Sequence, residues 1–231
     1  MKISELKKTL GNFTLSITDM RFEAGKVHGL IGANGSGKTT LSKLIMGIYP
    51  PDEGEIDYEG IQPGEYTMIT QRPYLLHGTV YQNLVYPLKL RGIPVDEAVA
   101  DEWLGRCGLL GKRKQYARSL SSGERQKLSF ARAMIFSPRL VIIDESFSNL
   151  DPDSVKMFDE LIKEQQKKNP LTWIIISHQL VHISRICDQV HFMENGRNLI
   201  SGTVGEVLLS PTNDAVCRYL EATEISFKGR G

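Results

Sequence analysis

The stretch Gly32-Ala33-Asn34-Gly35-Ser36-Gly37-Lys38-Thr39 decides the fold class of this chain. It fits the pattern G-x-x-x-x-G-K-[ST], in which glycines let backbone amides curl around phosphate groups. Lys38 places an ammonium beside the β- and γ-phosphates, and the hydroxyl of Thr39 suits Mg²⁺. The helix expected after the loop points its positive end at the same anion. The stretch therefore predicts a phosphate-binding loop between a strand and a helix.

The flanking segments supply the strand and the helix that such a loop needs. Residues 26–31 are predicted as a β-strand, and residues 39–49 as a helix stopped by Pro50-Pro51. Strands and helices continue to alternate, which predicts an α/β fold. The later elements are expected as strands at 65–70, 140–143 and 172–176, a helix at 153–168 and a hairpin turn at Asn195-Gly196.

The region between residues 80 and 137 differs from the rest because its pattern is mostly helical. We therefore expect one domain, with a core at about 1–79 and 138–222 and an inserted helical subdomain at about 80–137. The remaining residues, about 223–231, are polar and are expected to form a mobile tail.

Two carboxylates, Asp144 and Glu145, follow the apolar strand at 140–143. Ligands of open α/β sheets bind at the carboxyl ends of the strands. Asp144 suits a contact with Mg²⁺, and Glu145 could polarise an attacking water as a general base. Acidic residues at a strand end are commonly just solvated. After a phosphate-binding loop in the same chain, however, we expect these two to serve phosphate chemistry.

A second candidate anion site lies at Leu120-Ser121-Ser122-Gly123-Glu124. The spacing of Ser121 and Glu124 is that of a capping box, which opens a helix. A capped helix N-terminus with serine hydroxyls and a glycine also suits an anion. The two interpretations are compatible, and the stretch predicts a helix start that can face phosphate.

Together these motifs resemble those of the ATP-binding cassette (ABC) ATPase family, and the resemblance covers roughly residues 1–222. It implies a P-loop NTPase with a RecA-like core around a mixed sheet, an antiparallel β part and an inserted α-helical subdomain. The family motifs occur in family order, as Gly32–Thr39 (Walker A), Gln71 (Q-loop), Leu120–Glu124 (signature), Leu140–Asp144 followed by the catalytic Glu145 (Walker B), Ser148–Asp151 (D-loop) and His178 (switch histidine).

The resemblance also implies cofactors and residue roles. The cofactors are ATP and Mg²⁺, and the implied catalytic residues are Glu145, His178 and Lys38. Thr39, Gln71 and Asp144 are the implied metal contacts. The implied nucleotide contacts are Gly32, Asn34, Gly35, Ser36, Gly37, Lys38, Thr39, Thr40, Gln71 and Phe13, with Ser121, Ser122 and Gly123 acting in trans from a second copy of the chain.

Three features depart from the family pattern. Ser122 and Glu124 stand where Gly and Gln are common, and we expect Glu124 to point back to the helix cap. Ser146 replaces the proline that usually follows the catalytic glutamate. Leu10 falls near the position of the usual adenine-stacking tyrosine and has no ring, so Phe13 is the expected substitute.

Charge and hydropathy bear on the partners. The 28 basic and 27 acidic residues give a net charge of +1, without the basic excess typical of nucleic-acid-binding proteins. No apolar run approaches the roughly 20 residues needed to span a bilayer, and the first residues lack the apolar segment of a signal peptide. We therefore expect no nucleic-acid partner, and membrane contact only through another chain.

The resemblance names that other chain as a permease. It implies a homodimer of cassettes on the cytoplasmic side of the inner membrane, in a prokaryotic importer. The segment from Gln71 to about Tyr86 would meet the permease, with Tyr74, Leu75 and Tyr81 as contacts. Residues 78–84 and 211–213 look similar to cassettes of anion importers, including tungstate or phosphate systems. The alternative is a non-transport ABC ATPase that acts on another macromolecular partner.

Overall fold

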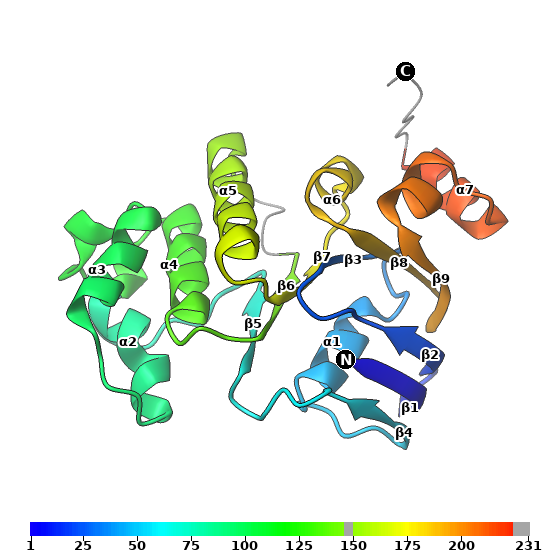
Figure 1. Ribbon diagram of the computed structural model, residues 1–231, viewed down its shortest axis with the longest axis horizontal. Helices are drawn as coiled ribbons and strands as arrows, with labels where there is room; N and C mark the ends of the chain where they lie inside the picture. The colour runs from blue at the N-terminus through cyan, green and yellow to red at the C-terminus, as the bar shows by residue number, and fades with distance from the viewer. Residues whose placement is uncertain (146–149, 224–231) are drawn as a thin grey trace.

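The computed structural model describes residues 1–145 and 150–223, and a six-stranded sheet lies at the centre of this part (Figure 1). Counted across the sheet from one edge to the other, the first five strands pair in parallel and the sixth pairs antiparallel, so the sheet is mixed as expected. In spatial order the strands are β5 (Tyr66–Thr70), β6 (Leu140–Asp144), β7 (Thr172–Ile176), β3 (Val27–Ile31), β8 (Gln189–Glu194) and β9 (Arg197–Thr203). The strands predicted near 26–31, 65–70, 140–143 and 172–176 are thereby confirmed.

A second, antiparallel sheet covers one face of the central sheet. Its strands, in spatial order, are β2 (Phe13–Arg21), β1 (Lys2–Leu10) and β4 (Glu53–Asp57). Buried Leu6 and Leu15 from this sheet share one apolar core with Leu30 of β3 and with Leu41 and Leu44 of α1 (Lys38–Ile45). The helix that carries the phosphate loop is thus held between the two sheets.

The other face of the central sheet is covered by helices. Successive side chains of a strand point to opposite faces, so Ile31 belongs to this second core while its neighbour Leu30 belongs to the first. The covering elements are α5 (Pro152–Lys168), α6 (Leu180–Ile186), the π-helical turn η3 (Gly205–Leu209) and α7 (Asp214–Ala222). The predicted helix at 153–168 corresponds to α5.

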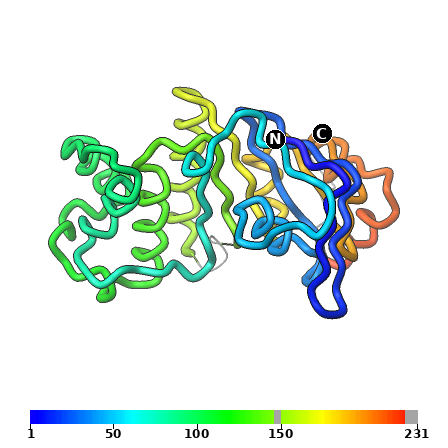
Figure 2. Tube along the Cα trace, turned by 90° about the horizontal axis from the view of Figure 1, so that it is seen from below, coloured from blue at the N-terminus to red at the C-terminus, as the bar shows by residue number. Residues whose placement is uncertain are grey.

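The mostly helical stretch of the sequence lies at one end of the molecule, as the green segments of Figures 1 and 2 show in two perpendicular views. Thr79 caps its first helix in a capping box with Gln82. The elements are α2 (Val80–Leu90), α3 (Glu97–Arg106), the 3₁₀ turns η1 (Leu110–Lys112) and η2 (Ala117–Ser119), and α4 (Ser122–Met134). The division into a core and a separate helical subdomain remains a prediction. In residues 1–145 and 150–223, no helix combines the length and the apolar character that membrane crossing requires.

The helix after the phosphate loop is shorter than the sequence pattern predicts. It ends at Ile45, four residues before Tyr49, so Pro50-Pro51 is not what stops it. Gly47 adopts a left-handed φ of 67° and donates to the carbonyl of Leu44 at 2.9 Å, while Ile48 donates to Lys43 at 2.9 Å. These are the two bonds of a Schellman motif, and they end the helix before the prolines are reached.

The predicted hairpin turn at Asn195-Gly196 joins β8 to β9. Both residues have positive φ angles, 48° and 77°, as a type I′ turn requires. A Cβ atom on Gly196 would lie 2.2 Å from the carbonyl oxygen of Thr14, and the carbonyl of Gly196 accepts from the amide of Ser16 at 2.8 Å. The turn therefore also fastens the smaller sheet to the central one.

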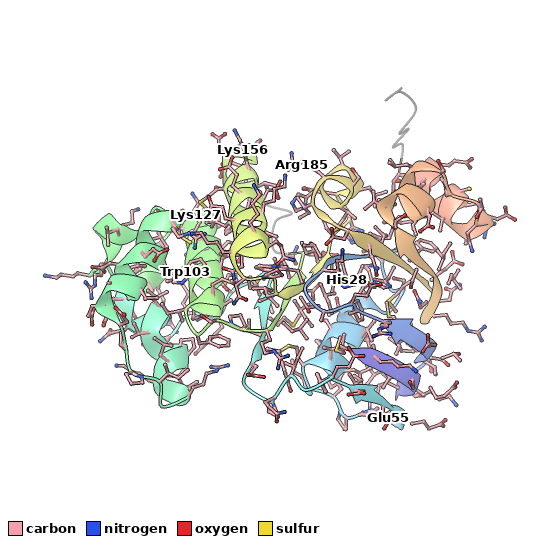
Figure 3. All side chains as sticks on the ribbon, in the orientation of Figure 1. His28, Glu55, Trp103, Lys127, Lys156 and Arg185 are labelled. Atoms are coloured by element: carbon pink, nitrogen blue, oxygen red, sulfur yellow. The ribbon has the colours of Figure 1, made fainter. Side chains whose placement is uncertain are left out.

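Two fully buried histidines, His28 of β3 and His191 of β8, link neighbouring strands (His28 is labelled in Figure 3). His28 Nδ1 lies 3.0 Å from His191 Nε2, His28 Nε2 lies 3.0 Å from the carbonyl of Glu23, and His191 Nδ1 lies 2.7 Å from Ser201 Oγ. Because the Glu23 carbonyl can only accept, the network assigns a hydrogen to His28 Nε2, and His191 Nε2–H then donates to His28 Nδ1. Burial lowers the pKa of both rings, that of His191 to about 3.

Acid is therefore expected to destabilise the fold. Because both folded-state pKa values lie below the usual 6.5, the unfolded chain binds more protons in acid, and stability present above about pH 6.5 is lost as the pH falls. Each such proton contributes a slope of about 1.4 kcal/mol per pH unit. Thermal unfolding of wild type, His191→Gln and the exposed control His77→Gln across this range would test the idea. The pH dependence should flatten only in His191→Gln, and equal slopes in all three proteins would contradict it.

Candidate functional site

The phosphate loop between β3 and α1 depends on glycine at three positions. Gly32, Gly35 and Gly37 have φ angles of 143°, 78° and 106°, a region that glycine enters without strain. A Cβ atom on Gly32 would lie 2.1 Å from the carbonyl oxygen of Met193 at the end of β8. Any other residue there would push the loop away from the sheet, so the sequence pattern reflects a real conformational requirement.

Lys38, the first residue of α1, is buried and folds back over this loop. Burial lowers the pKa of its ammonium, whereas the nearby carboxylates of Glu145 and Asp144 act in the opposite direction. A cation so placed interacts strongly with an arriving phosphate because little water screens it. Its ammonium donates to three oxygens of its own loop, namely Gly32 O at 2.8 Å, Ala33 O at 2.9 Å and Ser36 Oγ at 3.3 Å.

Thr39 and Asp144 come together although 105 residues separate them in the sequence (144 − 39). The Thr39 hydroxyl donates to the Asp144 carboxylate. Burial raises the pKa of Asp144 and the charge of Glu145 raises it further, while the Thr39 hydrogen bond and Lys38 oppose the shift. A hydroxyl and a carboxylate in contact offer the hard oxygen ligands that Mg²⁺ prefers. These residues therefore fit the implied metal.

Glu145 and His178 form a pair at the carboxyl ends of β6 and β7. Glu145 Oε1 lies 2.6 Å from His178 Nε2, and both side chains are half-buried. The backbone of Glu145 is left-handed, with φ of 48°, and its amide donates to the carbonyl of Ile176 at 3.0 Å. Left-handed backbone at a non-glycine residue is strained and is concentrated at functional sites. The arrangement aims a carboxylate, oriented by an imidazole, beside the phosphate loop.

One cavity of about 330 Å³ gathers most of the sequence-predicted nucleotide contacts. Gly32 and Ser36 do not line the cavity but accept hydrogen bonds from Lys38, and His178 contacts the lining residue Glu145. The lining residues are Phe13, Asn34, Gly35, Gly37, Lys38, Thr39, Thr40 and Glu145. The cavity thus joins a cation, phosphate-loop backbone and a carboxylate that can activate water.

Phe13, the expected base platform, begins β2 and pairs across the hairpin with Leu10. Its ring packs against the phosphate loop, because a Cβ atom on Gly37 would lie 3.0 Å from Phe13 Cζ. Leu10 is 37% exposed and is not among the residues that line the cavity. The geometry therefore supports the choice of Phe13 over Leu10.

Phe13→Ala is expected to weaken ATP binding by roughly 1–3 kcal/mol, the range of base–aromatic stacking in nucleic-acid sites. Leu10→Tyr would add a second ring opposite Phe13 in the hairpin and is expected to strengthen binding. Titration calorimetry with ATP measures both effects. The loop contacts of Lys38 persist in either variant, so an unchanged ATP affinity in Phe13→Ala would remove Phe13 from the site.

The signature stretch lies at the start of α4 and does not line the cavity beside Lys38. Ser121 accepts from the Glu124 amide at 3.3 Å, and Glu124 accepts from the Ser121 amide at 3.0 Å, so the predicted capping box is confirmed. The hydrogen bond from Lys112 is the main reason why the pKa of Glu124 is lowered. Ser121 and Ser122 are exposed, so their hydroxyls are accessible to a second molecule.

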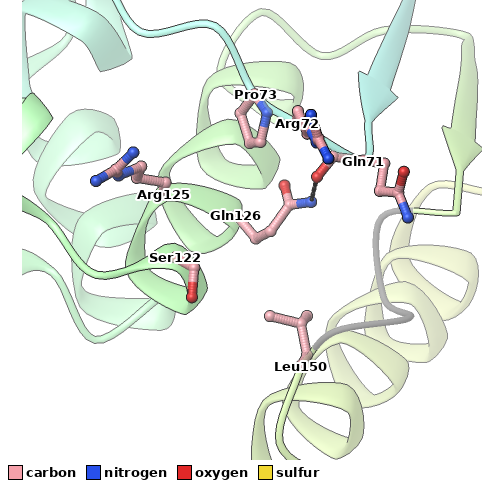
Figure 4. A pocket seen from close by; sticks show the side chains of 7 residues that line it. All are labelled: Gln71, Arg72, Pro73, Ser122, Arg125, Gln126 and Leu150. Atoms are coloured by element: carbon pink, nitrogen blue, oxygen red, sulfur yellow. Dashed lines mark hydrogen bonds between the residues drawn. The ribbon is translucent and has the colours of Figure 1, made fainter.

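Gln71 lines a different cavity, of about 300 Å³, between β5, α4 and the start of α5 (Figure 4). Its backbone carbonyl accepts from Gln126 Nε2 of α4 at 2.9 Å, drawn as a dashed line, and Ser122 and Leu150 also line the space. The structure thus brings Gln71 beside the signature helix, and its contact with a metal remains a prediction. Of the D-loop, Asp151 caps α5. The positions Ser146, Ser148 and Asn149 lie outside the described residues.

Sequence reasoning missed two residues that shape these sites. Lys112 forms an ion pair with Glu124, but the spacing of the two residues in the sequence does not predict it. Gln126 is 7% exposed and holds the Gln71 carbonyl. A polar residue on the buried face of a predicted amphipathic helix is the signal that could have identified Gln126, since buried polar groups need hydrogen-bond partners.

Comparisons with known proteins agree with this geometry. The family model described as ABC transporter matches residues 15–148. The tungstate uptake system ATP-binding protein TupC of Peptoclostridium acidaminophilum is 37% identical over 202 residues, covering 84% of this chain and 94% of that protein. The methionine import ATP-binding protein MetN of Caulobacter vibrioides is 35% identical over 229 residues, covering 93% of this chain and 69% of that protein.

Solved structures share the same fold. An ATP-binding subunit of an ABC transporter superposes with a TM-score of 0.83 at 25% identity, covering 95% of this chain and 98% of that one. The cbiO1 protein of Clostridium perfringens, part of the ABC transporter complex cbiONQ, gives 0.78 at 26% identity, covering 96% and 94%. With the phosphate loop, the Glu145–His178 pair and the capped signature helix in place, this chain belongs to the ABC transporter family, as one of its ATP-binding subunits.

Proposed function

We propose that this subunit hydrolyses Mg-ATP as a head-to-tail homodimer and that hydrolysis energises import through a separate permease. One observation carries the proposal: a single cavity combines Lys38, Thr39 and Glu145, while the exposed Ser121 and Ser122 lie elsewhere on the same chain. The cavity is therefore equipped for phosphate chemistry, and Ser121 and Ser122 would join it only from a second molecule.

Thr39 and Asp144 would hold Mg²⁺, and Gln71 is proposed as a further contact from the neighbouring cavity. The ion, when bound, would draw charge from the β- and γ-phosphate oxygens. Lys38 would turn from its own loop towards the same oxygens. These groups position and stabilise charge, which is most of what phosphoryl transfer asks of a protein.

Glu145 would accept the proton of the attacking water, since its carboxylate opens into the cavity. His178 would donate its Nε2–H to the Glu145 carboxylate across 2.6 Å, orient that carboxylate and approach the γ-phosphate. The products are ADP and inorganic phosphate. The strained backbone of Glu145, fastened by the Ile176 carbonyl, keeps the carboxylate in place without nucleotide.

A second copy would complete the site in trans. Ser121, Ser122 and Gly123 start a helix whose N-terminus favours an anion, and their partner would be the γ-phosphate in the opposite molecule. Glu124 does not oppose this contact, because Lys112 and the Ser121 amide hold its charge. A head-to-tail pair of equivalent sites follows from twofold symmetry.

Import and the permease partner are inferred from the relatives. TupC is named for tungstate uptake and MetN for methionine import. Relatives that serve such different solutes are consistent with a subunit that binds ATP and does not bind the transported solute. We propose that the subunit sits on the cytoplasmic side of the inner membrane, held there by the permease. Hydrolysis without a permease-like partner would favour the non-transport alternative.

The segment after Gln71 is the proposed permease contact, and the structure corrects one of its expected residues. Leu75 is only 5% exposed and belongs to the core, so its expected surface role is wrong. Leu75 is drawn inward because it extends the apolar cluster beneath α2. Tyr81 is also partly covered, by the Arg113 guanidinium 4.2 Å from its ring centre. Tyr74 remains 71% exposed, with its carbonyl fixed by Arg132 at 2.8 Å.

Tyr74→Ala tests the proposed function. Exposed aromatic anchors of interfaces commonly contribute about 2 kcal/mol, so the variant should bind the permease roughly thirtyfold more weakly. ATP affinity should not change. The permease would be co-purified in detergent with wild type, with Tyr74→Ala and with Leu209→Ala, a control at another exposed apolar position. Loss of ATP binding with normal permease association would show that the segment serves the nucleotide instead.

A further inference from the structure

The C-terminal helix α7 contacts β8, which pairs with β3, the strand that leads into the phosphate loop. The ring of Tyr219 lies 5.2 Å from that of Phe192 in β8. Phe192 pairs with Ile31, the last residue of β3, and Gly32 follows directly. Met193 follows Phe192 in β8, and its carbonyl oxygen would clash with a Cβ atom on Gly32. Tyr219 therefore stands behind the loop, on the face of the sheet opposite α1.

The hydroxyl of Tyr219 is buried and makes no hydrogen bond of good geometry within residues 1–145 and 150–223. Burial raises the pKa of Tyr219, and the negative charge of Glu145 raises it further. The backbone amide of Gly32, which faces the hydroxyl oxygen, lowers the pKa. The hydroxyl thus lies near the Gly32 peptide without a well-formed bond to it. By contrast, the hydroxyl of Tyr58 donates to Ile45 O at 2.6 Å. An unsatisfied buried hydroxyl is unfavourable, so a state that satisfies it is favoured.

The Gly32 peptide is one of the loop groups whose bonding must change for Lys38 to reach a phosphate. Its carbonyl accepts from Lys38 Nζ at 2.8 Å, and Lys38 must loosen this bond to reach a phosphate. A tyrosine hydroxyl can donate and accept, so Tyr219 can serve either polar group of a peptide that has shifted. The bond that is poorly formed here would then close in the nucleotide-bound state.

We propose that Tyr219 is a positioning residue of the ATP site: its hydroxyl bonds the Gly32 peptide when phosphates occupy the loop, and so couples α7 to nucleotide binding. The inference rests on the proposed function, because it needs a chain that binds ATP. Tyr219 touches neither the nucleotide nor the attacking water, and acts through Gly32.

Tyr219→Phe removes the hydroxyl and keeps the ring against Phe192. A neutral hydrogen bond contributes up to about 1.4 kcal/mol, so the dissociation constant for ATP should rise by roughly three- to tenfold. The dissociation constant for ADP should rise equally, whereas that for adenosine, which has no phosphate, should not change. The melting temperature of the free chain should stay the same or rise, because an unsatisfied group has been removed.

The matched control is Tyr58→Phe, which loses a formed hydrogen bond at the far end of α1. It should lower the melting temperature and leave ATP affinity unchanged. If Tyr219→Phe behaves in the same way, or changes adenosine and ATP binding equally, Tyr219 is a packing residue and the inference is overturned. A wild-type chain that fails to bind ATP would refute the proposed function itself, an outcome that the wild-type titration separates from the first.

Discussion

Glu145→Gln is expected to abolish steady-state ATP hydrolysis and to accumulate an ATP-dependent dimer. Glutamine keeps the size of glutamate and can still hydrogen-bond to His178, 2.6 Å away in the wild type, but it cannot accept a proton as a base. Loss of a general base lowers a rate by roughly 10²–10⁴-fold. Lys38, Thr39 and Asp144 remain, so Mg-ATP should still bind.

The dimer should accumulate because both halves of the proposed shared site are intact. Removing a negative charge beside the γ-phosphate also weakens a repulsion that opposes closure. In the wild type, hydrolysis keeps reopening the pair, so that protein is expected to elute as a monomer. Size-exclusion chromatography with light scattering, with Mg-ATP and with Mg-ADP, measures the difference, and ADP should not produce the dimer.

Ser122→Trp in the Glu145→Gln background is the control for closure in trans. Ser122 is exposed in the free chain, so the bulky ring should leave folding and ATP binding intact while blocking a partner. A Glu145→Gln chain that stays monomeric at saturating ATP, both alone and in complex with the permease, would refute the head-to-tail arrangement. A dimer that survives Ser122→Trp would place the contact elsewhere.

Lys38→Ala is expected to lower ATP turnover by about 10²–10³-fold, the usual loss when one pre-placed electrostatic group is removed. The ammonium is the positive side chain among the residues that line the cavity, and its three loop bonds hold it there. Because the loop loses these bonds too, ATP affinity should fall with the rate. Phosphate release at saturating and limiting ATP separates the two effects.

Lys43→Ala is the matched control for Lys38→Ala. It removes a positive charge from the same helix, but its ammonium lies over the Tyr49 ring, 5.3 Å from the ring centre. Turnover in Lys43→Ala should stay close to that of wild type. Wild-type-like hydrolysis in Lys38→Ala would contradict the assignment of the phosphate loop, whereas equal losses in both variants would point to the net charge of the helix.

The candidate site could be predicted from the sequence where its requirements are local. Gly32, Gly35 and Gly37 take the positive φ angles that their pattern implies, and Ser121 with Glu124 forms the capping box that their spacing implies. Asp144 and Glu145 follow an apolar strand, so their place at a carboxyl end was evident. In each case the deciding contacts involve a few consecutive residues, and backbone conformation is encoded there directly.

The parts that sequence reasoning placed wrongly depend on distant partners. Leu75 was expected at the surface because it falls in the loop after Gln71 that the resemblance assigns to the permease, yet the cluster under α2 buries it. The predicted helix end at Tyr49 failed because Gly47 and its Schellman bonds act first. That second error was local and avoidable, since glycine after a helix is itself a stop signal.

By itself, then, the sequence determined the phosphate loop, the strand ends that carry acidic residues, and the helix caps, because short-range sterics and hydrogen bonds govern them. The tertiary structure alone decided that Thr39 bonds Asp144, that Lys112 neutralises Glu124, and that Tyr219 stands behind Gly32. The contact between Thr39 and Asp144 and that between Tyr219 and Gly32 depend on the order in which strands pair in the sheet, whereas Lys112 meets Glu124 where η1 packs beside α4. Strand order brings together residues that are far apart in the chain, and their spacing along the sequence does not show which of them will meet.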